Sequence, residues 1–291
     1  MSVVVVGDII TDVLTIHDGQ MTIGSDTPAR IRIAGGGSAA NTAAWLAYRG
    51  AAVTLVGVVG ADEAGSAHLT DLRDAGVTCV VRLAMGAPTG TVVVLSSGSE
   101  RTMLTQRGAN SLLSTVDISA GLAAPARHLH LSGYTLLDPA TREAGRHALV
   151  QARERGLTTS VDAASAGPLH SVGGRVFLGW VRGADVLLAN LDEARALLDR
   201  PDDADLLCRL LAEHVAVAVV KLGGLGALAC DGSTAASVPA RPAEAVDPTG
   251  AGDAFAAGFL IAWLAGSPLT QALDAGAELG AVAIGRYGAR P

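Results

Sequence analysis

Residues 247–255 read Asp247-Pro248-Thr249-Gly250-Ala251-Gly252-Asp253-Ala254-Phe255, a turn that leads into an apolar segment. Pro248 and the glycines disfavour regular structure up to Gly250, whereas residues 254–264 favour a helix. The turn is therefore expected at a helix N-terminus, where free backbone N–H groups and the positive end of the helix dipole attract an anion. Small side chains let a phosphate approach the backbone closely. This stretch predicts a phosphate-binding turn.

Asp253 falls in the first turn of that predicted helix and has two interpretations. The first is a helix cap, which satisfies free backbone N–H groups. The second is a general base, which must lie close to both an incoming hydroxyl and the phosphorus that it attacks. Because a carboxylate repels a phosphate, the second interpretation gives its position a chemical reason.

A second Gly-rich turn occurs near the other end of the chain, in Gly35-Gly36-Gly37-Ser38-Ala39-Ala40-Asn41. It also opens an Ala-rich helical segment, and Asn41 offers both hydrogen-bond donors and acceptors. Asp8 and Asp12 follow the first predicted strand, and ligands of parallel sheets bind beyond the carboxyl ends of the strands. Asp8 is equally suited to capping the turn.

Between the two turns, short β-branched runs alternate with Ala- and Leu-rich helical patterns. This alternation predicts βαβ units and a parallel sheet covered on both faces, in one α/β domain over residues 1–291. The expected strands are residues 3–6, 52–59, 128–131, 158–162, 185–188 and 215–222. The expected helices are residues 39–49, 64–75, 141–155, 203–214, 251–264 and 269–286.

Two regions depart from this rhythm, residues 12–33 and 80–107. Both show strand-like alternation with polar turns and no helical pattern, which predicts antiparallel hairpins. We expect them to form one small sheet that projects from the main domain. Such a sheet is either a lid over a pocket or a decoration at the sheet edge.

Composition excludes several classes of protein. Of the 291 residues, 49% are hydrophobic and 17% charged, which argues against disorder. A net charge of −7 with 3% aromatic residues does not fit a nucleic-acid surface. Apolar runs are too short for a signal peptide or a membrane span, and three widely spaced cysteines suit a reducing compartment. We expect a cytoplasmic protein.

The stretch from Asp247 to Phe255 resembles the C-terminal signature of the ribokinase/PfkB family of carbohydrate kinases, and the Gly35–Asn41 stretch resembles its N-terminal signature. The resemblance implies a ribokinase-like three-layer fold, with a mainly parallel central sheet, helices on both faces and a small β-sheet lid. It also implies ATP-dependent phosphorylation of a hydroxymethyl group on a small sugar. In this resemblance Asp253 is the catalytic base, and the amides of Gly250, Ala251 and Gly252 form an anion hole.

The same resemblance assigns the substrate side of the site. Gly36, Gly37 and Asn41 lie in the segment that holds sugar hydroxyls in the family. Asp12 takes the place of an acidic residue that accepts hydrogen bonds from two sugar hydroxyls. Family members often pair their lids, which implies a homodimer.

On the nucleotide side, Asn190-Leu191-Asp192-Glu193 resembles the family's Asn-x-x-Glu element, in which the Glu orders Mg²⁺ through water. Asn190 and Glu193 are also spaced as a helix capping box. Lys221 is the only lysine and precedes a Gly223–Gly226 loop that resembles the family's phosphate-lining loop. Lys221 is either a phosphate contact or a surface lysine.

A monovalent cation such as K⁺ is implied at Asp247 and Thr249, by resemblance to members that hold one beside the anion-hole turn. The acceptor is open among a neutral sugar, a nucleoside of the pseudouridine type and a 2-keto-3-deoxy sugar acid. Arg101 and Arg107 would suit an acidic acceptor if they face the pocket, and are otherwise solvated hairpin charges. A non-catalytic sugar or nucleotide sensor on the same fold is the alternative from another class.

Overall fold

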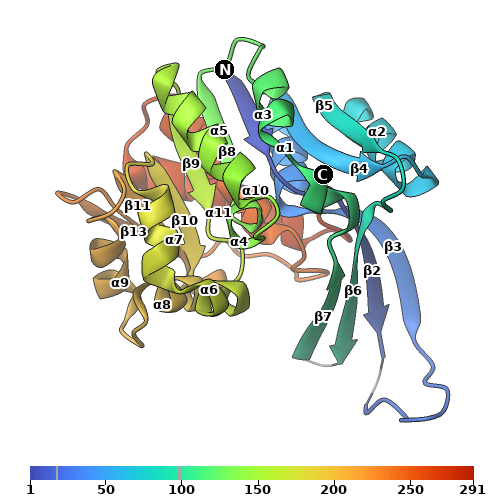
Figure 1. Cartoon of the computed structure of the whole chain (residues 1–291). Coiled ribbons are helices and arrows are strands. Elements are labelled where there is room, and N and C mark those ends of the chain that lie inside the picture. The colour runs from blue at the N-terminus through green and yellow to red at the C-terminus, as the bar shows by residue number, and fades with distance from the viewer. Residues whose placement is uncertain (18, 98–99) are drawn as a thin grey trace.

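The computed structural model describes residues 1–17, 19–97 and 100–291. In that part of the chain the strands form a nine-stranded sheet and a separate four-stranded sheet (Figure 1). The pairings in the large sheet are parallel except at one edge, where β12 pairs antiparallel with both β11 and β13. Its order is β13 (Ala235–Val238), β12 (Ala227–Cys230), β11 (Val217–Lys221), β10 (Val186–Asn190), β9 (Thr158–Asp162), β8 (His128–Ser132), β1 (Ser2–Val6), β4 (Ala52–Gly60) and β5 (Val77–Ala84).

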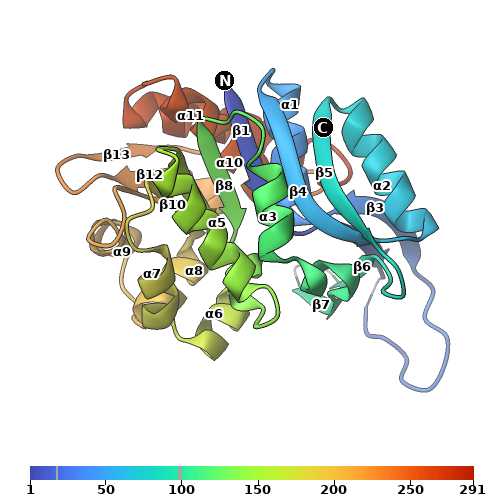
Figure 2. The same cartoon turned by 45° about the horizontal axis from the view of Figure 1, so that its top comes forward.

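Helices cover both faces of the large sheet, so strands such as β1, β10 and β11 are apolar along most of their length rather than alternating. One face is covered by α1 (Ser38–Tyr48), α2 (Glu63–Asp74), α10 (Ala251–Leu264) and α11 (Leu269–Ile284). The other face is covered by α3 (Thr115–Gly121), α4 (Tyr134–Leu137), α5 (Arg142–Glu154), α6 (Ala166–Val172), α7 (Gly174–Val181), α8 (Leu191–Leu198) and α9 (Ala204–Leu211). Figure 2 shows α3 and α5 in front of the large sheet and α10 and α11 behind it.

The small sheet projects from the main body, with the order β3 (Arg30–Gly36), β2 (Ile10–Ile16), β6 (Gly90–Ser97) and β7 (Glu100–Gln106) (Figure 1). β2 pairs with β3, and β6 with β7, as antiparallel hairpins, whereas β2 and β6 are parallel. The expectation of one small sheet from both regions is confirmed. Its range is corrected, because residues 80–84 belong to β5 and pair with β4 in the large sheet.

The predicted α/β class and the three-layer arrangement are confirmed, and every predicted strand and helix is present with ends that differ by a few residues. Two short 3-10 helices also occur, at Gly108–Leu112 and Gly223–Leu225. Among the described residues, none of the helices combines the length and the apolar character that a membrane crossing needs.

Candidate active site

A cavity of about 980 Å³ lies between the carboxyl edge of the large sheet and the inner face of the small sheet. On the large-sheet side it is lined by Asp8, Asn41, Asp162, Asn190, Glu193, Lys221 and Asp253. On the small-sheet side it is lined by Ile10, Asp12, Val92, Val94, Met103 and Thr105. Most of the residues predicted from the sequence therefore meet in one place. Gly36 and Asp247 do not line the cavity but contact residues that do.

Asp253 lies in the first turn of α10, with its carboxylate held by two side chains of the other Gly-rich segment. Ser38 Oγ donates to Oδ1 at 2.9 Å, and Asn41 Nδ2 donates to Oδ2 at 2.9 Å. Burial raises the pKa of Asp253 to about 7, partly offset by the Asn41 hydrogen bond. A carboxylate with that pKa can accept a proton near neutral pH, which a helix cap does not require.

The turn before α10 is built for a close approach to its backbone. Gly250 has φ 77°, in the left-handed region, and a Cβ there would lie 2.5 Å from the carbonyl oxygen of Ala289. The amide of Ala251 donates to the carbonyl of Pro248, whereas the amides of Gly250 and Gly252 meet no acceptor in the part of the chain that the structure describes. Of the three predicted anion-hole amides, those of Gly250 and Gly252 are thus available.

Lys221, at the end of β11, reaches the same point from the other side. A Cβ added at Gly252 would meet only Lys221 Nζ within contact distance, at 3.4 Å, so this space is open. Lys221 Nζ also lies 2.7 Å from Asp162 Oδ2, and its side chain is 14% exposed. Lys221 is therefore not a surface lysine.

Asp162, at the end of β9, was not identified from the sequence. Its other oxygen, Oδ1, accepts from the amide of Ala164, a non-glycine residue with φ 75°. Such left-handed backbone is uncommon for alanine and is typical of functional sites. The only sequence signal was a carboxylate as the last residue of a predicted strand, close to the signal that singled out Asp8 just after the first strand.

Asn190 and Glu193 form the capping box at the start of α8. Glu193 Oε2 accepts from the backbone amide of Asn190 at 2.7 Å. The Asn190 side chain accepts from the backbone amide of Glu193 and donates to the Glu193 carboxylate. Burial raises the pKa of Glu193 above its usual range, and the nearby Lys221 opposes this shift. The capping interpretation holds geometrically, and both residues also line the cavity. A buried carboxylate beside Asp162 suits a Mg²⁺ held through water.

The loop after β11 leaves room for a ligand. A Cβ at Gly223 or Gly224 would meet no atom within 4 Å, although both residues line the cavity. Gly226 has φ 108° and packs on the backbone of β13, where a Cβ would lie 2.0 Å from the carbonyl oxygen of Val238. The open backbone at Gly223 and Gly224 could admit an anion to its N–H groups, whereas the Gly226 amide donates to the carbonyl oxygen of Gly223.

Asp12 and Asp8 have different environments. Both carboxylate oxygens of Asp8 accept hydrogen bonds within the protein. Oδ1 accepts from Ser132 Oγ at 2.9 Å, and Oδ2 accepts from the backbone amide of Ser38 at 3.1 Å. Asp12 lines the cavity, and burial raises its pKa to about 6, with Arg290 opposing this shift. A Cβ at Gly36 would lie 2.0 Å from Asp12 Oδ2, so glycine leaves the space that this carboxylate fills.

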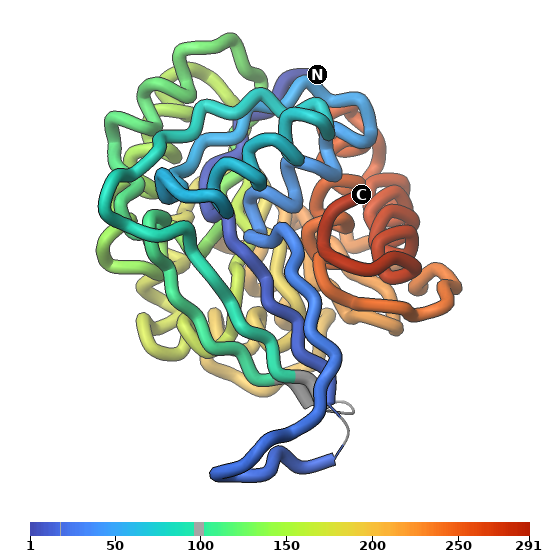
Figure 3. Tube along the Cα trace, turned by 90° about the vertical axis from the view of Figure 1, so that its right-hand side faces the viewer, coloured from blue at the N-terminus to red at the C-terminus, as the bar shows by residue number. Residues whose placement is uncertain are grey.

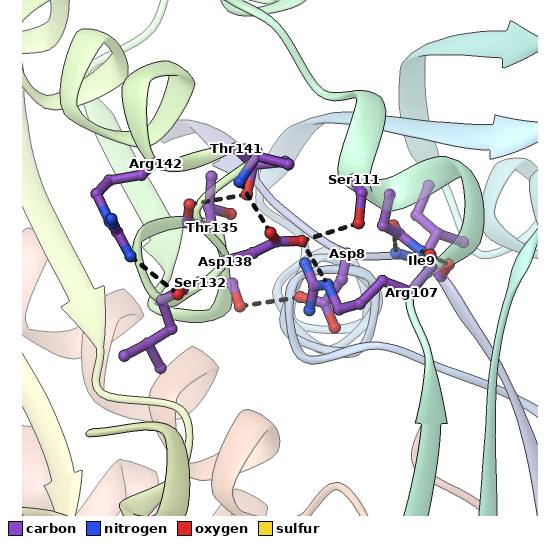
Figure 4. Close-up of polar contacts among 12 residues, drawn as sticks. Asp8, Ile9, Arg107, Ser111, Ser132, Thr135, Asp138, Thr141 and Arg142 are labelled. Atoms are coloured by element: carbon purple, nitrogen blue, oxygen red, sulfur yellow. Dashed lines mark hydrogen bonds and ion pairs between the residues drawn. The ribbon is translucent and has the colours of Figure 1, made fainter. Parts of the chain in front are cut away.

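Arg107, just beyond β7, is one of the residues that line the cavity. Figure 4 shows its side chain directed toward Asp138. Its Nε lies 3.2 Å from Asp138 Oδ2, which also accepts from Ser111 Oγ at 2.9 Å. The guanidinium lies 5.7 Å from the ring centre of Tyr134. Arg107 is therefore a positioned cation and not a solvated hairpin charge. Arg101 lies in β7, and its side chain is outside the described residues.

Asp247 and Thr249 form a compact turn rather than an open ligand set. Asp247 Oδ1 accepts from the amide and the hydroxyl of Thr249, at 2.9 and 2.6 Å. Asp247 Oδ2 accepts from the Gly288 amide at 3.2 Å. These side-chain contacts bind the anion-hole turn to the C-terminal segment of the chain, and a bound cation could use only the oxygen lone pairs that remain.

Known proteins similar to this chain are found both by sequence and by structure. A family model described as pfkB family carbohydrate kinase matches residues 1–291. The ATP-dependent ribose-1-phosphate kinase of Halopiger xanaduensis is 34% identical over 281 residues, covering 96% of this chain and 88% of that protein. The 2-dehydro-3-deoxygluconokinase of Thermoproteus tenax is 30% identical over 259 residues, covering 87% and 80%. The crystal structure of adenosine kinase from Sinorhizobium meliloti matches with a TM-score of 0.90 and 28% identity, covering 100% and 95%.

Proposed function

Because this chain belongs to the pfkB family of carbohydrate kinases, we propose that it transfers the γ-phosphoryl group of ATP to a hydroxymethyl group of a small sugar or sugar-like substrate, with Asp253 as general base. The observation that carries the proposal is the position of Asp253, a carboxylate with a pKa of about 7 beside an open amide and a buried ammonium. Kinases of this family use ATP with Mg²⁺.

In the proposed reaction, the substrate hydroxyl oxygen bonds to the γ-phosphorus while the bond from that phosphorus to the β,γ-bridging oxygen breaks. The hydroxyl proton passes to Asp253, and ADP leaves with the bridging oxygen. The Gly252 amide and Lys221 stabilise the charge on the transferring group, and this kind of stabilisation is the main catalytic contribution in phosphoryl transfer. Gly250 and Ala251 hold the turn in its conformation.

The nucleotide side of the proposal uses Asn190, Lys221 and the Gly223–Gly226 loop around the phosphates. Glu193 would hold Mg²⁺ through water, and Mg²⁺ when bound neutralises charge on the phosphate oxygens. K⁺ activation through Asp247 and Thr249 is a further part of the proposal, supported by the place of these residues beside the anion-hole turn. A cytoplasmic location is proposed from the unpaired thiols of Cys79, Cys208 and Cys230.

The small sheet is proposed as the lid. Its inner face supplies apolar side chains over the cavity, including Val92, Val94 and Met103. Such a cover would exclude water, which otherwise competes with the sugar hydroxyl for the γ-phosphorus. Asp12, Gly37 and Asn41 hold the sugar hydroxyls beneath it.

The acceptor is a neutral sugar in the first form of this proposal and an acidic sugar derivative in the second. Arg107 favours the second, because its guanidinium borders the cavity and can pair with a carboxylate or phosphate. Two of the relatives act on ribose 1-phosphate and 2-dehydro-3-deoxygluconate, as their names state, and both compounds are anionic at neutral pH. A nucleoside acceptor has a precedent in the adenosine kinase that shares the fold.

We propose that two copies associate through the outer face of the small sheet. Val13 of β2 pairs with Ile33 of β3 and with Val93 of β6, which pairs with Leu104 of β7, so these side chains form one row. Ile33 is 74% exposed and Leu104 is 58% exposed. A second copy would cover this row, since exposed contiguous apolar surface marks an association site.

The test of the proposed function is ADP release with Mg·ATP across neutral sugars, nucleosides, keto-sugar acids and sugar phosphates, with Na⁺ or K⁺. We expect acceptor-dependent turnover that Asp253→Asn lowers by at least about 10²-fold, as removal of a general base does. ATP affinity and thermal unfolding should stay close to the wild-type values. Retained turnover in Asp253→Asn would contradict the assignment of the base. ATP binding without turnover on any acceptor would favour a sensor over a kinase.

A further inference from the structure

The segment 286–290 folds back against both Gly-rich turns of the site (Figure 3). Trp45 Nε1 donates to the carbonyl oxygen of Ala289 at 2.9 Å, and the Gly288 amide donates to Asp247 at 3.2 Å. Ala289 also packs against Gly250. These contacts place Arg290 beside the start of α1, although the two are far apart in the sequence.

The guanidinium of Arg290 is embedded in the Gly35–Asn41 segment. Its Nη2 donates to the carbonyl oxygen of Gly36 at 2.8 Å, and its Nε donates to Asn41 Oδ1 at 3.3 Å. A Cβ at Gly35 would lie 2.4 Å from Nη1, so only glycine leaves room for this group. Nη1 is itself buried and has no acceptor among the described residues. Burying a donor without an acceptor costs free energy, which indicates that the hydrogen bonds of Arg290 to Gly36 and Asn41 offset this cost.

The contact between Arg290 and Asn41 decides which way the Asn41 amide points. A primary amide has one acceptor oxygen and one donor nitrogen. Because Arg290 is a donor only, it holds Oδ1, and the NH₂ group is directed to Asp253 Oδ2 at 2.9 Å. Without Arg290, the amide could turn over and present its oxygen to the carboxylate, which would repel it.

We propose that Arg290 is a positioning residue, which acts through Asn41 to orient and stabilise the carboxylate of Asp253. This inference rests on the proposed role of Asp253 as base. Arg290 would not touch either substrate. It therefore affects the phosphoryl-transfer step and the acceptor side of the site, and leaves ATP binding unchanged.

The charges around Asp253 support this role. The Asn41 hydrogen bond opposes the burial that raises the Asp253 pKa to about 7. Asp162, from β9, raises that pKa further, and Lys221, from β11, lowers it. Asp253 in turn helps to stabilise the charged form of Arg290, whose pKa burial lowers to about 10. Loss of the Asn41 bond should therefore raise the Asp253 pKa and move the acidic limb of the kcat profile to higher pH.

The test compares Arg290→Gln, Arg290→Lys and the control Arg286→Gln, each in the whole 291-residue chain. We expect Arg290→Gln to lower kcat by about 10- to 100-fold, as small misplacements of catalytic groups do. KM for ATP should be unchanged, and the acidic limb should shift upward. Arg290→Lys keeps the charge but has no fork to reach Gly36 and Asn41 together, so it should lose kcat similarly. Arg286 is exposed and lies over the rings of Trp45 and Tyr48, so Arg286→Gln should match the wild type.

A double-mutant cycle separates positioning from simple anchoring of the segment. In an Asn41→Ala background, Arg290→Gln should cause little further loss of kcat, because the route to Asp253 is already absent. Equal fold losses in both backgrounds, or full activity in Arg290→Lys, would overturn the proposal. If the wild type shows no kinase activity, the proposed function fails. If the wild type is active and Arg290→Gln retains full kcat, only the role of Arg290 fails.

Discussion

Lys221 shows how much the surroundings of one residue can change its role. Burial alone would lower its pKa, but the carboxylates of Asp162 and Glu193 raise it above the usual range. The ammonium thus stays charged inside the protein, because buried charges persist where they are paired. Lys221 supplies a fixed positive charge where the proposed transfer takes place.

Replacing this cation gives a prediction about the nucleotide side of the site. Lys221→Met should lower kcat by about 10²- to 10³-fold, a loss typical of removing a donor to transition-state charge. It should also raise KM for ATP, while KM for the acceptor changes little. Steady-state kinetics with each substrate varied in turn would measure this.

The control for Lys221→Met is the double variant Lys221→Met with Asp162→Asn. The single variant leaves Asp162 buried without its cation, and the double variant removes that imbalance. If Lys221 acts on phosphate, the double variant regains thermal stability but not activity. Recovery of activity in the double variant would show that Lys221 has a structural role only.

At the scale of elements, β8 and β9 pair through buried polar groups as well as through backbone hydrogen bonds. His128 Nε2 and His130 Nδ1 lie 2.7 and 2.8 Å from the same oxygen, Ser160 Oγ. Burial lowers the pKa of His128 to about 3 and that of His130 to about 4. Both rings are therefore neutral in the folded protein at neutral pH.

These histidines predict a loss of stability in mild acid. An unfolded histidine binds a proton below about pH 6.5, whereas the buried rings do so only near pH 3 to 4. Their contribution is present above pH 6.5 and is lost as pH falls towards 4, at up to about 1.4 kcal/mol per pH unit for each ring. Urea unfolding at pH 7, 6 and 5 would measure the slope.

His130→Asn removes one of these titrating groups. Whatever its stability at pH 7, the free energy of unfolding of this variant should fall less steeply with decreasing pH than that of the wild type. The matched control is His170→Asn on α6, since that side chain is exposed. A wild-type slope in His130→Asn would rule out this histidine as the source.

At the scale of the whole molecule, the small sheet has two different faces. Side chains alternate across it, so the face with Asp12, Val92 and Met103 lines the cavity while the row containing Ile33 and Leu104 points away. One element can therefore be both a cover for the site and an association surface.

The proposed association predicts a mass in solution of twice the 29.2 kDa of one chain. Ile33→Lys should give a monomer, because the outer face would carry a charge that a second copy must bury. Light scattering after size-exclusion chromatography would measure the mass.

Val116→Lys on α3 is the matched control, since Val116 is 75% exposed and remote from the small sheet in the fold. This variant should keep the wild-type mass. A monomeric wild type would contradict the association without affecting the kinase assignment.

The fold class and the two Gly-rich turns could be predicted from local sequence patterns. The positive φ at Gly37 and Gly250 requires glycine, and strands and helices require different spacings of apolar residues. Both requirements are local, so they can be recognised from residue type. The candidate residues Asn41, Lys221 and Asp253 were found because each lies next to a Gly-rich turn or at the end of a predicted strand.

Which distant residues join these candidates in the site became clear from the folded chain. Asp162 and Arg290 are single charged residues with no local pattern. Asp162 reaches the site because β9 and β11 both pair with β10 and end at the same edge of the sheet, and Arg290 reaches it because segment 286–290 folds back onto α1. The course of residues 80–84 was decided in the same way, since a short apolar strand fits either sheet and its pairing with β4 selects one. Pairing partners and folded-back segments depend on contacts between remote parts of the chain, which no local sequence pattern records.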